Sequence, residues 1–275
     1  MSIHLSDEGG APGATFRDVL AASDRPLDGI WIVSGSHVAA EIVAGSGIPW
    51  VLIDTEHAPN SLDGVLRQLQ AVEAGGGGRA GGPTPMVRVA ANDEVLLKQI
   101  LDIGAQNILV PMVNSLDEVA YAVGAVRYPP EGRRGVGSAL ARSGRWGRIG
   151  DYLQRADDYV SLFVQIESKE AALMAVDIAG ADGVDGIFLG PSDLAASMGL
   201  LGQQTHPDVG DVVTTVIRDV AAMGVPVGVN AFDPVVANHY RAAGASFVLV
   251  GADVSLMARG AEALADAWRG RARNG

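Results

Sequence analysis

The sequence predicts a single (β/α)8 barrel, and three observations lead to this prediction. Short runs rich in β-branched residues alternate with longer amphipathic stretches along the chain. Strands with few polar residues, each followed by a helix, are typical of parallel strands that are buried on both faces. Eight such units occur without a break in composition, and 275 residues suit the length of about 250 that one barrel needs.

These patterns place each expected element. The expected strands are Gly29–Val33, Trp50–Asp54, Met86–Val89, Asn107–Val110, Ser161–Glu167, Asp185–Leu189, Pro226–Val229 and Phe247–Val250. The expected helices are Leu62–Ala74, Asp93–Asp102, Leu116–Val126, Lys169–Ile178, Val209–Met223, Pro234–Ala243 and Val254–Trp268. An open doubly wound sheet is the alternative, because only the strand count separates the two folds. No Gly-x-Gly-x-x-Gly follows the first strand, which argues against a dinucleotide-binding sheet.

The chain is expected to be one domain over residues 1–275, with flexible ends at 1–14 and 270–275, where no apolar period occurs. Two internal segments interrupt the alternation of strands and helices. Ala74–Pro85 contains six glycines and is expected to form a flexible surface insertion. Tyr128–Gly150 is a long connection with five arginines, and connections of this length are usually functional or mobile.

The composition excludes several classes of protein. The net charge of −12 disfavours binding to nucleic acids and to anionic membranes. The chain has no cysteine, which excludes disulfides, thiolate nucleophiles and cysteine-based zinc sites. No basic segment precedes an apolar run at the N-terminus, and no stretch of about 18 apolar residues occurs. We therefore expect a soluble cytoplasmic protein without a signal peptide or a membrane span.

Two carboxylates stand at the ends of neighbouring expected strands. Gln165 and Glu167 share one face of the fifth strand, and Asp193 follows the sixth. Asp193 is equally suited to capping the helix that starts there. Together with Glu167, however, it forms half of a hard-oxygen site for Mg²⁺ or Mn²⁺. The turn that contains Pro191 and Ser192 opens a helix, whose first backbone amides can hold a carboxylate or phosphate.

Arg88 lies in an otherwise apolar strand. A buried arginine is costly unless it is paired or faces a polar cavity, so it forms either a structural ion pair or a donor to a developing enolate oxygen. His57 has Asp54 three residues before it, and this carboxylate could orient the imidazole as a base near neutral pH. The alternative for His57 is a structural histidine.

Two other kinds of active site are disfavoured. Lys98 and Lys169 are the only lysines, and both fall in expected helices, whereas a Schiff-base aldolase needs a desolvated lysine that faces the substrate. No Gly-x-Ser-x-Gly elbow for nucleophilic hydrolysis occurs.

Five separated motifs resemble those of the HpcH/HpaI aldolase family. They are Val51–Asn60 (VLIDTEHAPN), Leu109–Val113 (LVPMV), Arg127–Gly137 (RYPPEGRRGVG), Val164–Glu167 (VQIE) and Gly183–Leu194 (GVDGIFLGPSDL). The similarity extends from Leu27 to Trp268. It is strongest to members that act on 4-hydroxy-2-oxoheptanedioate, through Ser138–Arg142 and Trp146–Tyr152.

The resemblance implies a phosphoenolpyruvate/pyruvate-domain-like barrel and a class II pyruvate aldolase of aromatic catabolism. Such an enzyme reversibly cleaves a 4-hydroxy-2-oxo acid, such as 4-hydroxy-2-oxoheptanedioate, to pyruvate plus an aldehyde. Its divalent metal is Mg²⁺, Mn²⁺ or Co²⁺. Family members are typically hexamers, arranged as trimers of dimers, in which the last helix is exchanged, so Val254–Trp268 is expected to pack on another subunit.

The resemblance also implies a role for each candidate residue. Glu167 and Asp193 match the family's metal ligands, and Arg88 matches the arginine that contacts the keto oxygen. His57 and Asp54 match the acid–base pair. The remaining substrate-binding candidates are Trp31, Gln165, Ser192, Asp193 and Asn230. Asn230 departs from the family pattern, in which an aliphatic residue lines this part of the pocket, so the aldehyde stays open.

Two alternative functions are compatible with the barrel. A citramalyl- or malyl-CoA lyase of the same superfamily would need basic groups for CoA, which the five arginines between Arg133 and Arg148 could supply. The compact length and the Glu56–Pro59 motif argue against it. A non-catalytic barrel that binds a small acid is disfavoured because both carboxylates, Arg88 and His57 are all present.

Overall fold

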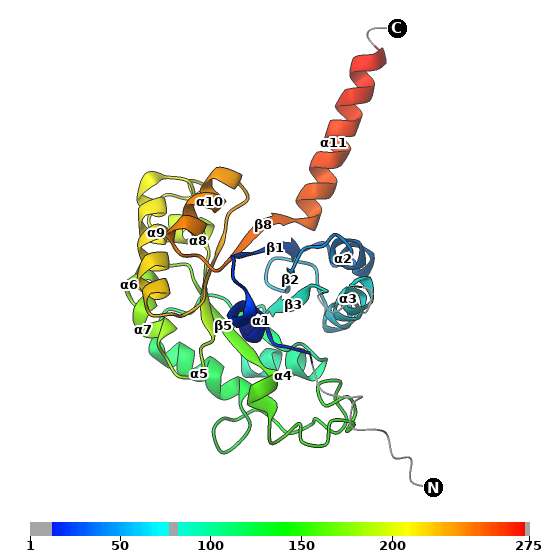
Figure 1. Cartoon of the computed structure of the whole chain (residues 1–275), viewed down its shortest axis with the longest axis vertical. Coiled ribbons are helices and arrows are strands. Elements are labelled where there is room, and N and C mark those ends of the chain that lie inside the picture. Colours follow the sequence, from blue (N-terminus) through cyan, green and yellow to red (C-terminus); the bar gives the residue numbers. More distant parts are fainter. Residues whose placement is uncertain (1–12, 77–81, 273–275) are drawn as a thin grey trace.

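The computed structural model describes residues 13–76 and 82–272, which form a closed barrel of eight parallel strands (Figure 1). The strands are β1 Leu27–Ile32, β2 Trp50–Asp54, β3 Thr84–Arg88, β4 Asn107–Val110, β5 Ser161–Ile166, β6 Gly186–Leu189, β7 Val227–Asn230 and β8 Phe247–Ala252. Each strand pairs with the next in sequence, and β8 closes on β1. The predicted barrel is confirmed, and the open-sheet alternative is excluded.

Eleven α-helices lie among the described residues, and all but α1 and α11 surround the barrel (Figure 1). They are α1 Phe16–Ala22, α2 His37–Ala44, α3 Leu62–Gly75, α4 Glu94–Asp102, α5 Leu116–Val126, α6 Lys169–Leu173, α7 Ala175–Ala179, α8 Pro191–Ser197, α9 Pro207–Ala222, α10 Pro234–Ala243 and α11 Asp253–Ala272, with a 3-10 turn at Ala156–Tyr159. The expected helices are present, but the one predicted at Lys169–Ile178 is two, because the backbone leaves helical geometry at Met174. Helices α1 and α2 were not predicted.

Two apolar cores hold the barrel. The outer core lies between the strands and the helices and consists mainly of Val, Ile, Leu and Ala. The inner core fills the barrel and includes Trp50, Phe163, Phe188 and Phe247. These rings need space from neighbouring strands: a Cβ on Gly228 would lie 2.1 Å from the Phe247 ring. Glycine therefore allows bulky aromatic residues inside a narrow barrel.

Helix α1 closes the end of the barrel at which the strands begin. Phe16 is fully buried, and its ring lies 5.0 to 5.6 Å from those of Trp50, Phe163 and Phe247. Its backbone N–H donates to Asn107 Oδ1 on β4. Thr15 and Asp18 form a capping box that starts this short helix. The amino end of the barrel is thus filled by a side chain from outside the sheet.

The long connection after α5 is bound to the barrel. It joins α5 to β5 and therefore lies at the amino ends of the strands. Its five arginines have these partners: Arg133 with Glu94 and the Tyr121 carbonyl, Arg134 with Asp102 and Tyr152, Arg142 with Glu73 and the Ile103 carbonyl, Arg145 with Glu73, and Arg148 with the Arg145 carbonyl. Arg134 is buried beside the Tyr128 ring, 4.6 Å away. The connection is held by ion pairs to α3 and α4.

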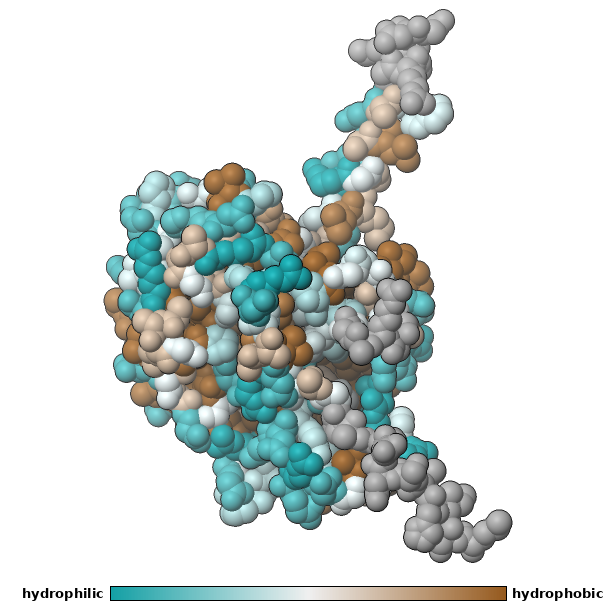
Figure 2. Space-filling view, in the orientation of Figure 1, coloured by the Kyte–Doolittle hydropathy of each residue, from teal (hydrophilic) through white to brown (hydrophobic). Residues whose placement is uncertain are grey.

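Helix α11 projects away from the barrel rather than covering it (Figure 1). Apolar side chains along it are exposed, among them Leu256, Met257 and Leu264 (Figure 2). The helix continues to Ala272, so regular structure extends into the 270–275 segment that was expected to be flexible. Residues 77–81 of the expected glycine-rich insertion, and residues 1–12 and 273–275, lie outside the described residues. Within the described ranges, no helix is long and apolar enough to cross a membrane.

Candidate active site

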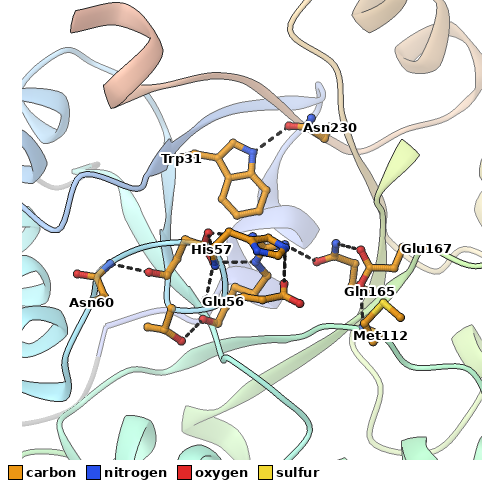
Figure 3. Close-up of polar contacts among 11 residues, drawn as sticks. Trp31, Glu56, His57, Asn60, Met112, Gln165, Glu167 and Asn230 are labelled. Carbon is orange, nitrogen blue, oxygen red and sulfur yellow. Dashed lines mark hydrogen bonds and ion pairs between the residues drawn. The ribbon is translucent and has the colours of Figure 1, made fainter. Parts of the chain in front are cut away.

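Side chains from the four odd-numbered strands form one layer across the mouth of the barrel, at the carboxyl ends of the strands. They are Trp31, Arg88, Gln165 and Asn230, and barrel interiors are built from such layers of four. Direct contacts join the layer (Figure 3). The Trp31 indole Nε1 donates to Asn230 Oδ1 at 2.9 Å, and the Arg88 Cζ lies 4.4 Å from the centre of the Trp31 ring. Arg88 Nη1 lies 3.5 Å from Gln165 Oε1.

Arg88 carries a buried positive charge that Asp54 balances. The two residues are 6% and 2% exposed, so neither charge is solvated by bulk water. Two parallel contacts of 2.8 and 2.9 Å join Nε and Nη2 of Arg88 to the two Asp54 carboxylate oxygens. Such a bidentate pair fixes the plane of the guanidinium. It leaves Nη1 directed at the mouth, beside Gln165 and Glu56.

The position of His57 differs from the predicted acid–base pair. Asp54 was expected to orient its imidazole, but the Asp54 carboxylate is occupied by Arg88 and accepts the backbone N–H groups of Glu56 and His57. The imidazole is 68% exposed, and its Nε2 lies 4.0 Å from Glu56 Oε2. Register explains the difference, because Asp54 lies directly beside Arg88 on the neighbouring strand.

Glu56 is a site residue that the sequence patterns did not single out. Its Oε2 forms an ion pair with Arg88 Nη1 at 2.9 Å, and this buried oxygen makes no hydrogen bond in the described structure. Burial raises the pKa of Glu56, although the charges of Arg88 and His57 act against this increase. The sequence feature that could have identified Glu56 is its position between Asp54 and His57 at the end of a strand.

Glu167 lies at the centre of the site. It is 3% exposed, and it accepts hydrogen bonds from the Met112 backbone N–H at 2.8 Å and from Gln165 Nε2. Burial raises the pKa of Glu167 to about 7, and the carboxylates of Glu56 and Asp193 act in the same direction. The site therefore holds more negative charge than Arg88 alone neutralises.

Asp193 and Ser192 lie in the first turn of α8, exposed at the mouth. Asp193 does not cap this helix, because the cap position is Gly190, and within the described residues no side chain caps it. Gly190 also provides space: a Cβ there would lie 2.8 Å from Glu167 Oε2 and 2.9 Å from Gln165 Nε2. The absence of a side chain at Gly190 allows the turn to approach Glu167.

The arrangement suits a divalent cation, although the chain supplies only part of a site. Among residues 13–76 and 82–272, no three His, Asp or Glu side chains cluster tightly enough to hold a metal ion by themselves. The excess of negative charge around Glu167 fits an additional cation nearby. Hard carboxylate oxygens are the ligands that Mg²⁺ and Mn²⁺ prefer.

Comparison with known proteins agrees with this geometry. Residues 28–260 match the family described as HpcH/HpaI aldolase/citrate lyase. The chain belongs to this family. The resemblance seen in the sequence motifs is confirmed.

Relatives in the family are similar over almost the whole chain. A 4-hydroxy-2-oxo-heptane-1,7-dioate aldolase of Salmonella dublin is 48% identical over 91% of this chain and 92% of its own length. The crystal structure of an HpcH/HpaI aldolase/citrate lyase family protein from Burkholderia cenocepacia has a TM-score of 0.86 and 39% identity, over 92% of this chain and 98% of that one. A citrate synthase, SbnG, has a TM-score of 0.79 and 25% identity, over 90% and 95%. The chain is therefore an enzyme, a lyase of the aldolase type.

Substitution of Gly190 tests the close approach at Glu167. We expect Gly190→Ala to fold and to lose lyase activity by roughly 100-fold, because shifts of about 1 Å in a catalytic group have effects of this size. Gly210→Ala on α9 is the matched control, since a Cβ there would meet nothing within 4 Å. Steady-state kinetics and thermal melting of both variants make the comparison. Equal activity in the two variants would contradict this role for Gly190.

Proposed function

We propose that this enzyme is a class II pyruvate aldolase, which reversibly cleaves a 4-hydroxy-2-oxo acid to pyruvate and an aldehyde. The substrate class follows the 4-hydroxy-2-oxo-heptane-1,7-dioate aldolase that is 48% identical. The observation that best supports the proposal is the buried Glu167, whose pKa is raised to about 7 beside Asp193 and opposite the paired Arg88. Buried carboxylates with perturbed pKa values at a strand end of a barrel are typical of catalytic sites.

Glu167 and Asp193 are the residues proposed to hold a divalent metal, Mg²⁺, Mn²⁺ or Co²⁺. When bound, the cation would supply positive charge that makes the pyruvate methyl group more acidic. Arg88 donates from Nη1 towards the keto oxygen and stabilises the enolate charge there. Its orientation for this task is set by Asp54, through the bidentate pair. The first backbone N–H groups of α8, at Ser192 and Asp193, donate hydrogen bonds to the substrate carboxylate.

His57 is proposed to move the proton of the C4 hydroxyl group. Its imidazole is exposed at the mouth, so it exchanges protons readily with solvent between turnovers. The nearest carboxylate oxygen to the imidazole is Glu56 Oε2, 4.0 Å from Nε2. Trp31 and Gln165 line the pocket and limit the access of water to Arg88.

The two alternative functions lose support. A CoA lyase would use the arginines between Arg133 and Arg148, but these are paired and lie at the opposite end of the barrel from Glu167. A non-catalytic acid-binding barrel would not require the combination of Glu167, Arg88 and His57 in one mouth. No observation favours either alternative over the aldolase.

We also propose that the chain forms homo-oligomers, as hexamers built from three dimers, in which α11 is exchanged between subunits. Leu256, Met257 and Leu264 are 59 to 61% exposed on a helix that projects from the barrel. Exposed apolar side chains along one helix are typical of a surface that is covered in an assembly.

Retro-aldol cleavage with and without metal tests the proposed activity. Pyruvate release from 4-hydroxy-2-oxo acids should stop when EDTA is added and return with excess Mn²⁺. Glu167→Gln, which retains the size of the side chain, should lose Mn²⁺-dependent turnover by at least about 100-fold. Lys169→Gln on the exposed start of α6 is the control for expression and folding. Pyruvate release that persists fully in EDTA would contradict the proposal.

The raised pKa of Glu167 predicts that metal affinity depends on pH. At a pKa of about 7, half of the Glu167 carboxyl groups are protonated at pH 7, and the proton must leave before a cation binds. Mn²⁺ affinity should therefore fall roughly fivefold from pH 7 to pH 6, and change little above pH 8. Calorimetric titration with Mn²⁺ at each pH measures this. A constant affinity from pH 6 to 8 would show that Glu167 is not a ligand.

The proposed exchange of α11 predicts the effect of charge on this helix. Leu256→Glu combined with Leu264→Glu should lower the mass of the assembly, because charged side chains are costly to bury. Light scattering coupled to size-exclusion chromatography gives the mass. Leu173→Glu on α6, where the leucine is 82% exposed, is the control. Loss of the assembly in the control alone would place the interface elsewhere.

A further inference from the structure

Asn230 is the last residue of β7, and its side chain faces the barrel mouth. Two residues earlier on the same strand, a Cβ on Gly228 would lie 2.1 Å from the ring of Phe247, which belongs to the inner core. Side chains alternate along a strand, so Asn230 points to the same interior side, one layer nearer the mouth. It is partly buried, within reach of a molecule that occupies the mouth.

The Trp31 indole determines which end of the Asn230 amide faces outward. An indole N–H can only donate, so the atom that accepts from it at 2.9 Å must be Oδ1. Trp31 itself is 8% exposed and is held between Arg88 and the Phe188 ring, 6.3 Å away. The ring therefore fixes the amide, and the Nδ2 group keeps two N–H donors that have no acceptor among the described residues.

Asn230 is separated from the part of the site that would bind pyruvate. In Figure 3, Asn230 and Trp31 lie in the upper part of the view, and Glu56, Gln165 and Glu167 lie in the lower part. Pyruvate would bind among the carboxylates and Arg88, so the Nδ2 donors lie on the side of the mouth where the rest of the substrate extends. A neutral N–H donor there pairs with an oxygen atom and gains nothing from a methyl or methylene group.

We propose that the Asn230 amide is a specificity-determining group that donates a hydrogen bond to an oxygen on the aldehyde half of the substrate. Aldehydes that carry a hydroxyl or carboxylate oxygen are therefore preferred over unsubstituted aldehydes of the same length. This proposal rests on the proposed aldolase function. It assigns a donor role that is separate from the support that Asn230 gives to Trp31.

Two substitutions separate the donor role from the support of Trp31. Asn230→Asp keeps an acceptor for the indole but removes both N–H donors, whereas Asn230→Leu removes both functions. The kcat/KM for condensation with pyruvate is measured for glycolaldehyde against acetaldehyde, and for succinic semialdehyde against butanal. The ratio within each pair cancels any loss of folded enzyme. The ratio compares the kcat/KM of the oxygen-bearing aldehyde with that of the unsubstituted aldehyde in the same pair. In at least one pair, we expect this ratio to fall about fivefold in both variants, which is the effect of one hydrogen bond.

Each outcome decides the assignment. A fall in the first pair identifies a hydroxyl oxygen as the partner, and a fall in the second identifies a carboxylate. Ratios that stay within twofold of the unsubstituted enzyme in both variants would overturn the proposal. A kcat/KM ratio that falls in Asn230→Leu but not in Asn230→Asp would also overturn the proposal, because Asn230 would then act only through its support of Trp31.

Failure of the underlying aldolase function has a different signature. An enzyme that condenses pyruvate with none of the four aldehydes would refute the proposed function itself. Condensation with unchanged ratios would refute only the role of Asn230.

Discussion

The buried ion pair between Arg88 and Asp54 is the constraint on which the site depends. A lone guanidinium at 6% exposure would be strongly destabilising, and losing one partner of such a pair costs about 3 to 5 kcal/mol. The pair forms because parallel register places Asp54 beside Arg88 at the ends of β2 and β3. Once the guanidinium is fixed, its flat face supports Trp31, and its remaining nitrogen meets Glu56 and Gln165.

The rest of the mouth is organised by an imbalance of charge. Arg88 carries one positive charge and contacts both Asp54 and Glu56, so it cannot balance these two carboxylates together with those of Glu167 and Asp193. Burial, together with repulsion from Glu56 and Asp193, raises the pKa of Glu167 to about 7. A site of this kind binds a proton or a metal cation, and the two compete for the same oxygen atoms.

Alternation of apolar strands with amphipathic helices was sufficient to predict the barrel, because both patterns are local. Arg88 and Glu167 were also predictable, since charged residues in buried strands need a function or a partner. The Asp54–His57 pairing was wrong because the partner of Asp54 lies 34 residues away in sequence and becomes adjacent only through strand register. Contact between Trp31 and Asn230 spans 199 residues and exists only after β8 closes on β1. Helix α1 was missed because it is short, although Thr15 and Asp18 formed a readable cap.

The aromatic side chain of Phe16, which closes one end of the barrel, bears on the order in which substrates bind and products leave. Among the described residues, Phe16, Trp50, Phe163 and Phe247 fill the amino end of the barrel, so a substrate reaches the site from the carboxyl mouth. If the keto-acid half of the substrate binds deepest in the mouth, the other half must leave the site first after cleavage. In the proposed reaction the aldehyde departs before pyruvate, and in the reverse direction pyruvate binds before the aldehyde. The filled amino end thus agrees with an ordered kinetic mechanism for the proposed reaction.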